Sequence, residues 1–247
     1  MDAKARQEVA RGDIFLGPRR VRYRVVRSRR ARLIRLRMLG DGAVEIVVPP
    51  RVRVPPIEVL LQSKQIWICR QLDRFDALPP IRTDRVDYLG KEYRVVVTRQ
   101  DGRTGRITRR DQEFRVHLHR DAEPATLIET FLRNQARSIL RDRVRIWAEV
   151  MHVEYGRISV RDQRSRWGSC STNGSLSFSW RLVMAPLPVL DYVVIHELIH
   201  LREMNHGKQF WNGVASYCPE HQRHRAWLKE NGVKLARPVR IEDSGRA

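Results

Sequence analysis

Three histidines and one glutamate lie within eleven residues of the chain, at spacings that suit metal-dependent hydrolysis. His196, Glu197 and His200 form the pattern His-Glu-x-x-His, and His206 follows six residues after His200. On a helix, side chains four residues apart leave the same face, so the imidazoles of His196 and His200 can reach one metal ion. Glu197 lies beside that face, where a carboxylate can accept a proton from metal-activated water.

The neighbouring residues predict a buried helix that ends before His206. Asn205 and Gly207 flank this histidine, so the chain can turn there and bring the third imidazole back towards the other two. Three protein ligands with one open position are typical of a catalytic zinc site. We therefore expect one Zn²⁺ ion on His196, His200 and His206. The alternative is a chance amphipathic helix with solvated histidines. Apolar residues surround the polar group and argue against that alternative: Val193, Val194, Leu198, Ile199 and Leu201.

The elements that must position this helix can also be predicted from the pattern of the chain. Apolar residues recur at helical spacing from 125 to 151, which predicts a long backing helix. The stretch 164–171, RSRWGSCS, leads through Asn173-Gly174 into the alternating residues 175–180, which predicts a β-hairpin. Pro186 and Pro188 then mark the start of the His-Glu-His helix.

The first half of the chain predicts mainly strands. A hairpin is expected from residues 32–38 and 43–48, followed by one helix from 57 to 75. Residues 78–84 are expected to form a linker. Two further strands, 93–98 and 114–118, are expected to be joined by a polar hairpin connection.

Composition limits the cellular setting and the kinds of partner. The net charge is +20, and only six of the 48 basic residues are lysine. This charge is compatible with a nucleic-acid partner and equally with an arginine-rich composition without a polyanion ligand. Three widely spaced cysteines (Cys69, Cys170 and Cys218) favour a reducing, cytoplasmic location. We expect no signal peptide and no membrane span.

The segment VVIHELIHLREMNHGKQFW, together with RSRWGSCS upstream, resembles the YgjP-like metallopeptidase family, which is related to the SprT-like zincins. The resemblance extends over about residues 20–232. It implies an α+β fold with an N-terminal, Arg-rich and β-rich domain over 13–122. A zincin-like domain over 123–232 follows, with a backing helix, a short sheet and the HExxH helix. Residues 1–12 and 233–247 are expected to be tails.

The resemblance implies that His196, His200 and His206 bind zinc and that Glu197 is the catalytic carboxylate. In zincins generally, an extended peptide lies along an edge strand above the metal, which here points to residues 167–171. Candidates for substrate contact are Arg166, Trp167 and Tyr192, with Arg166 or Tyr192 stabilising the oxyanion. The alternative gives this stretch structural roles: Trp167 lies in the core, Gly168 allows a close backbone approach and Arg166 forms an ion pair. Glu203 stands where metzincins have glycine, so the path to the third histidine should differ from theirs.

The expected function is that of a zinc-dependent metallopeptidase acting on a peptide or protein. One alternative is a metal-dependent nucleotide (pyro)phosphohydrolase, although no phosphate-binding loop is evident in the sequence. Another is a nucleic-acid-associated protease of SprT-like type, tethered by the basic N-terminal region. The sequence leaves the oligomeric state and the physiological substrate open.

Overall fold

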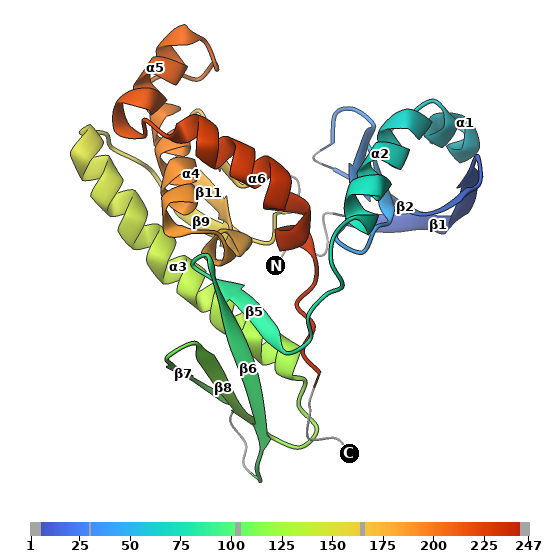
Figure 1. The fold of residues 1–247 in the computed structure, drawn as a ribbon. Coiled ribbons are helices and arrows are strands. Elements are labelled where there is room, and N and C mark those ends of the chain that lie inside the picture. The colour runs from blue at the N-terminus through green and yellow to red at the C-terminus, as the bar shows by residue number, and fades with distance from the viewer. Residues whose placement is uncertain (1–5, 30, 102–104, 164–165, 243–247) are drawn as a thin grey trace. The chain divides into compact units, whose positions relative to one another are not determined.

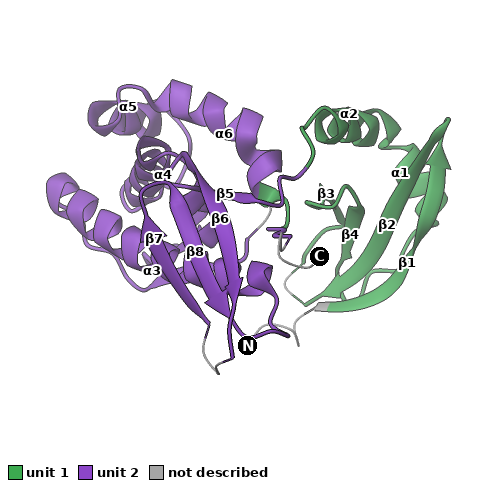
Figure 2. Ribbon diagram, turned by 60° about the horizontal axis from the view of Figure 1, so that its bottom comes forward, with its two compact units in different colours: residues 1–80, 236–238 green, residues 81–235, 239–247 purple. Residues whose placement is uncertain are grey.

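The computed structural model describes residues 6–29, 31–101, 105–163 and 166–242, which form a mixed α+β protein (Figure 1). The chain divides into two compact units, drawn in two colours in Figure 2. Unit 1 comprises residues 1–80 and 236–238, and unit 2 comprises residues 81–235 and 239–247. No helix within the described ranges is both long enough and apolar enough to cross a membrane.

Unit 1 is built on a four-stranded sheet in the order β1-β2-β4-β3. Side chains on one face of the sheet, among them Val25 and Ile46, are fully buried against Leu61 and Ile68 of two short helices. The elements are β1 (Arg6–Leu16), β2 (Arg19–Ser28), β3 (Arg35–Met38), β4 (Val44–Val48), α1 (Ile57–Gln62) and α2 (Gln65–Asp76). The predicted hairpin is confirmed, because β3 and β4 pair antiparallel.

Two predictions in unit 1 need correction. The expected tail over residues 1–12 is wrong for Arg6 onwards, because β1 pairs antiparallel with β2 along its length. Main-chain pairing stabilises this edge strand while most of its side chains stay exposed, so it carries no clear hydrophobic pattern.

The single helix expected over 57–75 is two helices. The break follows Gln62, where the Ser63 hydroxyl donates to the Leu60 carbonyl at 2.8 Å and competes with the helical hydrogen bonds.

The second sheet belongs to unit 2 and has the order β5-β6-β8-β7. Its strands are β5 (Arg85–Tyr88), β6 (Lys91–Arg99), β7 (Arg106–Arg110) and β8 (Glu113–Leu118). The predicted hairpin between 93–98 and 114–118 is wrong, because β6 and β8 run parallel. The intervening chain supplies β7, which pairs antiparallel with β8. Its sequence, RITRR, contains one apolar residue, so it lacks the pattern of a strand.

The helix α3 (Pro124–Met151) joins this sheet to the rest of unit 2, as Figure 1 shows. Buried residues recur along one of its faces, from Ile128 to Met151, as the periodicity predicts. A three-stranded sheet follows, with the order β10-β11-β9. Its strands are β9 (Ile158–Arg161), β10 (Gly168–Cys170) and β11 (Leu176–Ser179), and the predicted β10–β11 hairpin is confirmed.

The chain then passes through a 3₁₀ turn, Trp180–Met184, into three helices: α4 (Leu187–Ile199), α5 (Lys208–Tyr217) and α6 (His221–Ala236). The expected tail from residue 233 is wrong for the described residues, because α6 continues to Ala236 with Leu235 buried, and Ile241 belongs to the buried core cluster.

The compact units divide after Pro80, whereas the predicted domains divide after residue 122. The difference has a physical cause. Phe114 and Val116 of β8 belong to the same buried cluster as Ile128 and Leu132 of α3 and Leu190 of α4. The second sheet and the C-terminal elements therefore share one core.

Candidate metal centre and active-site cleft

The helix α4 carries the first two histidines into the interior of unit 2. Its N-cap is Pro186, and Pro188 lies in the first turn, where a missing N–H removes no helical hydrogen bond. Most of its later residues are buried on every side, so the helix lies within the core rather than on it. As a result Glu197 and His200 are buried and His196 is half-buried.

The third histidine reaches the group through a turn between α4 and α5. Glu203 N–H donates to the Ile199 carbonyl at 2.9 Å, which folds the chain back after the helix. Phe210 of α5 is fully buried beneath the histidines. Its ring centroid lies 4.9 Å from that of His196 and 4.6 Å from those of His200 and His206.

The three imidazoles converge on a common point. One ring nitrogen from each of His196, His200 and His206 lies within 4.8 Å of the other two. His196 Nε2 and His206 Nε2 are 3.1 Å apart. Nitrogens that share one tetrahedral zinc ion lie roughly 3.3 Å apart. The donor set therefore fits a metal ion, and the metal identity does not follow from the geometry alone.

Local contacts favour the ligating form of these rings. His200 Nδ1 lies 3.0 Å from the Glu203 carbonyl oxygen and donates to it, which leaves Nε2 with a free lone pair. Burial, together with the nearby His200, His206 and Arg225, lowers the pKa of His196 to about 3. Burial also lowers the pKa of His200. Both rings are therefore neutral at neutral pH, as metal ligation requires.

Glu197 is the buried carboxylate beside the histidines. Its exposed fraction is 5%, and it has no ion-pair partner among the described residues. Burial raises its pKa to about 7, although a hydrogen bond from the Cys170 backbone and the charge of Arg166 oppose that rise. A group that titrates near neutral pH can both accept and return a proton.

The close approach of β10 to α4 explains the glycine in the RWGSC stretch. A Cβ atom at Gly168 would lie 2.5 Å from Glu197 Oε1 and 2.6 Å from its Cγ. Such contacts are shorter than real Cβ atoms show, so a larger residue would displace the carboxylate. Gly168 thus has the close-approach role expected of it, and its neighbour in that approach is the Glu197 side chain.

A cleft of about 350 Å³ opens on this group. Glu197 and His196 line it, together with the three predicted substrate residues Arg166, Trp167 and Tyr192. The Tyr192 ring stands edge-on to His196 with centroids 6.0 Å apart. Trp167 is half-buried and packs against the core. Arg166 is exposed and forms no ion pair with a described carboxylate, so its expected structural pairing is absent from the part of the chain that is described.

The helix α6 supplies cleft residues that the sequence did not indicate: Arg225, Leu228 and Lys229. The pattern of residues 222–229 predicts a helix but not the surface on which that helix packs. The Arg225 guanidinium lies 5.1 Å from the centre of the Trp211 ring. An arginine four residues before a lysine, on a helix close to the metal motif, is the signal that could have suggested this role.

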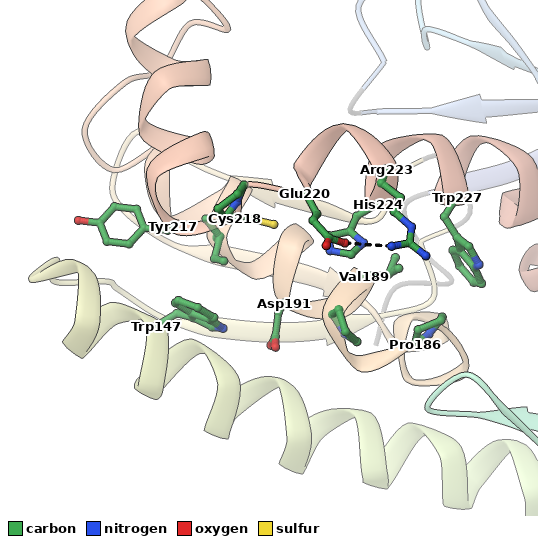
Figure 3. A pocket seen from close by; sticks show the side chains of 13 residues that line it. Trp147, Pro186, Val189, Asp191, Tyr217, Cys218, Glu220, Arg223, His224 and Trp227 are labelled. Atoms are coloured by element: carbon green, nitrogen blue, oxygen red, sulfur yellow. Dashed lines mark hydrogen bonds and ion pairs between the residues drawn. The ribbon is translucent and has the colours of Figure 1, made fainter.

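A second pocket, of about 620 Å³, borders a different set of α4 residues (Figure 3). Asp191 and Val189 of α4 line it with Trp147 of α3 and Trp227 of α6. Asp191 accepts two hydrogen bonds from Arg143, at 2.6 and 2.7 Å. The pocket shares no residue with the cleft, and the three histidines are not among its lining.

Comparison with known proteins adds an independent line of evidence. A family model described as "YgjP-like, metallopeptidase domain" matches residues 32–231. Curated protein sequences give no match. Among solved structures, the crystal structure of the metallopeptidase zymogen of Methanocaldococcus jannaschii jannalysin aligns with a TM-score of 0.34 and 22% sequence identity. That alignment covers 37% of this chain and 95% of the other.

Proposed function

The chain belongs to the YgjP-like metallopeptidase family, and from that premise we propose that it is a zinc-dependent peptidase of the HExxH type. The observation that carries the proposal is the convergence of His196, His200 and His206 beside the buried Glu197. Neutral imidazoles suit zinc, and three of them leave one coordination position open. When bound, the ion would supply a Lewis acid that lowers the pKa of water and polarises the peptide carbonyl.

Glu197 is the general base in this proposal. Its carboxylate accepts a proton from the attacking water and then donates it to the leaving amine. Burial without an ion pair favours this task, because a carboxylate held by an arginine would be a weaker base. The hydrogen bond from the Cys170 backbone fixes the carboxylate against β10, where Gly168 leaves room for it.

The substrate is proposed to lie along β10. This strand is at the edge of its sheet, so its outer main-chain groups can pair with an extended peptide. Trp167 and Tyr192 line the cleft beside that strand and would contact substrate side chains. Arg166 and Tyr192 are the two candidates for stabilising the oxyanion. A Tyr192→Phe variant and an Arg166→Gln variant, compared by kcat, would tell them apart, since the true donor affects kcat more than KM.

Metal analysis of the purified protein is the first test. We expect one equivalent of zinc, lost in His196→Ala and retained in Glu197→Gln. A casein-type peptide assay alongside a nucleoside triphosphate assay then separates the peptidase from the nucleotide hydrolase. Protein without zinc, or a fully active Glu197→Gln variant, would refute the proposal. Hydrolysis of the nucleotide alone would replace peptide with nucleotide as the substrate.

A nucleic-acid partner is proposed for unit 1 because exposed arginines gather at one end of its sheet. The parallel strands β2 and β4 end side by side, with Arg27 paired with Val48. Arg27 Nη1 also donates to the Pro50 and Val52 carbonyls, which links the end of β2 to the loop after β4. Four exposed cations on the loops after β2 and β4 have no ion-pair partner among the described residues: Arg29, Arg32, Arg51 and Arg53.

DNA binding measured across a salt series tests this partner. Phosphate contacts predict an affinity that falls steeply as salt rises, with a shallower slope when the four loop arginines are changed to glutamine. Absence of binding at low salt would refute it.

The cytoplasmic location remains a prediction, with which the free thiols of Cys69, Cys170 and Cys218 agree.

A further inference from the structure

The cleft is lined by three cations and a single carboxylate. Arg166, Arg225 and Lys229 supply the positive charges, and Glu197 supplies the carboxylate. All three cationic side chains belong to exposed residues, whereas Glu197 is buried. Among the described residues, none of the three cations has a carboxylate within ion-pair distance, although many other arginines of the chain are paired. The mouth of the cleft therefore carries a net positive charge.

These cations come from two elements. Arg166 precedes β10, whereas Arg225 and Lys229 are four residues apart on α6 and so share one helix face. The Arg225 guanidinium lies over the Trp211 ring, whose centroid is 6.0 Å from His196 and 5.9 Å from His206. That stacking places one positive charge close to the metal-binding histidines.

Like charges in a concave site repel one another and focus a positive potential into it. A ligand that brings negative charge relieves this repulsion, whereas a cationic ligand adds to it. The apolar neighbours Trp167, Val193 and Leu228 lower the local dielectric and strengthen the attraction. The charges around the cleft therefore favour negatively charged substrates over positively charged ones.

We propose that the cleft selects peptides that carry a carboxylate close to the scissile bond. Two sources of that group have the same chemistry: an acidic side chain beside the bond, or the free C-terminus of a short peptide. The proposal rests on the peptidase function and specifies its substrate class. Arg225 and Lys229 of α6 are the specificity residues. Arg166, which precedes β10, adds to their positive potential.

The test uses fluorogenic peptides that differ only in charge. One series places Glu, Gln or Lys beside the cleaved bond, and a second pairs free with amidated C-termini. We expect kcat/KM at low ionic strength to favour the Glu peptide over the Gln peptide by roughly tenfold, and this preference should shrink as salt screens the charges. If the C-terminus supplies the carboxylate, the preference appears in the second series and amidation abolishes it.

Charge reversal separates specificity from a structural role. Lys229→Glu balances the two remaining cations with two carboxylates, so it should abolish the preference for the Glu peptide over the Lys peptide, which a merely destabilised enzyme would not show. Arg225→Gln should reduce the preference for acidic peptides by severalfold. Arg223→Gln is the matched control, because it removes the same charge from the same helix. Arg223 pairs with Glu220 at 3.3 Å and lines the second pocket (Figure 3), so this variant should keep the preference.

Equal cleavage of acidic, neutral and basic peptides would overturn the inference and leave the peptidase function standing. The same holds if Arg225→Gln and Arg223→Gln reduce the charge preference alike. If no peptide of either series is cleaved by zinc-loaded protein, the proposed function itself fails.

Discussion

Each unit contains one buried glutamate to compare. The two side chains are buried to a similar extent but differ in their ion-pair and hydrogen-bond partners. Glu45 of unit 1 has an exposed fraction of 1%, and Glu197 of unit 2 has 5%. Glu45 accepts hydrogen bonds from Arg24 at 2.7 and 3.1 Å and from Arg37 at 2.5 Å. Glu197 has a hydrogen bond from the Cys170 backbone and no described ion pair.

The difference in partners, rather than in burial, separates a structural carboxylate from the proposed general base. Two guanidinium groups hold the charge of Glu45 in place and join three strands of its sheet. The surroundings of Glu197 leave its charged form poorly stabilised, so its affinity for a proton rises. Perturbed groups in clefts are candidates for catalysis on this physical ground. Four substitutions test whether these partners set the roles of the two glutamates.

The largest effect should come from Glu197→Gln, which removes the proposed base and nearly preserves the shape of the side chain. We expect kcat to fall by roughly 10²–10⁴-fold, the usual range for loss of a general base. Zinc content and thermal stability should stay close to those of the parent protein, as metal analysis and calorimetry would reveal. Activity within a few-fold of the parent would remove the distinction between the two glutamates.

Gly168→Ala should produce the next largest effect, because the added Cβ displaces the Glu197 carboxylate. We expect a loss of kcat of about 100-fold with zinc retained, since misplacement of a catalytic group by about 1 Å has this order of effect. Steady-state kinetics and metal analysis measure both quantities. Gly207→Ala is the matched control: its φ of −77° suits alanine, and an added Cβ meets nothing within 4 Å. Equal losses in both variants would contradict the steric explanation.

Glu45→Gln should reduce stability instead of chemistry. Removing the carboxylate leaves Arg24 and Arg37 without their shared partner. Loss of one member of a fully buried pair costs about 3–5 kcal/mol. Arg24 is partly exposed, so we expect about 2 kcal/mol here. Urea unfolding measures the loss, and the kcat of the folded fraction should be unchanged. An unaltered unfolding midpoint would show that the arginines find other partners.

Asp191→Asn should have the smallest effect and tests the contrast within a single helix. Asp191 pairs with Arg143 and joins α4 to α3, six residues before Glu197. We expect a loss of about 1 kcal/mol in unfolding free energy, because the pair is partly exposed. Peptidase activity at 25 °C should remain within about twofold, since a paired carboxylate in the second pocket takes no part in the reaction. A loss as large as that of Glu197→Gln would contradict this assignment.

The elements that could be predicted from the sequence are those whose burial imposes a period on it. The helix α3 and the two confirmed hairpins follow from alternating or helical spacing of apolar residues. The strands β1 and β7 escaped prediction because edge strands depend on main-chain pairing and tolerate arginine at most positions. The parallel pairing of β6 with β8 is a long-range choice that local spacing does not encode.

The residues of the candidate site also divide into those that local spacing predicts and those that only tertiary packing determines. Ligand candidates follow from the spacing of His196, His200 and His206, because a helix and one turn fix their separation. Gly168 was predictable as a point of close approach, but not as the neighbour of Glu197. The spacing of Arg225 and Lys229 places them on one helix face, but tertiary packing decides that this face of α6 borders the cleft.

The turn between β5 and β6 determines how the protein can be shortened. Leu89 N–H donates to the Val183 carbonyl at 2.7 Å, just before α4. Gly90, with a φ of +75°, lies so close to Pro186 that an added Cβ would come within 2.8 Å of it. A fragment beginning at residue 123 would lack this contact and the sheet that fills the core behind α3. The smallest fragment expected to retain the histidine group begins near Ile81, so expression trials and crystallisation of the enzymatic part should start there.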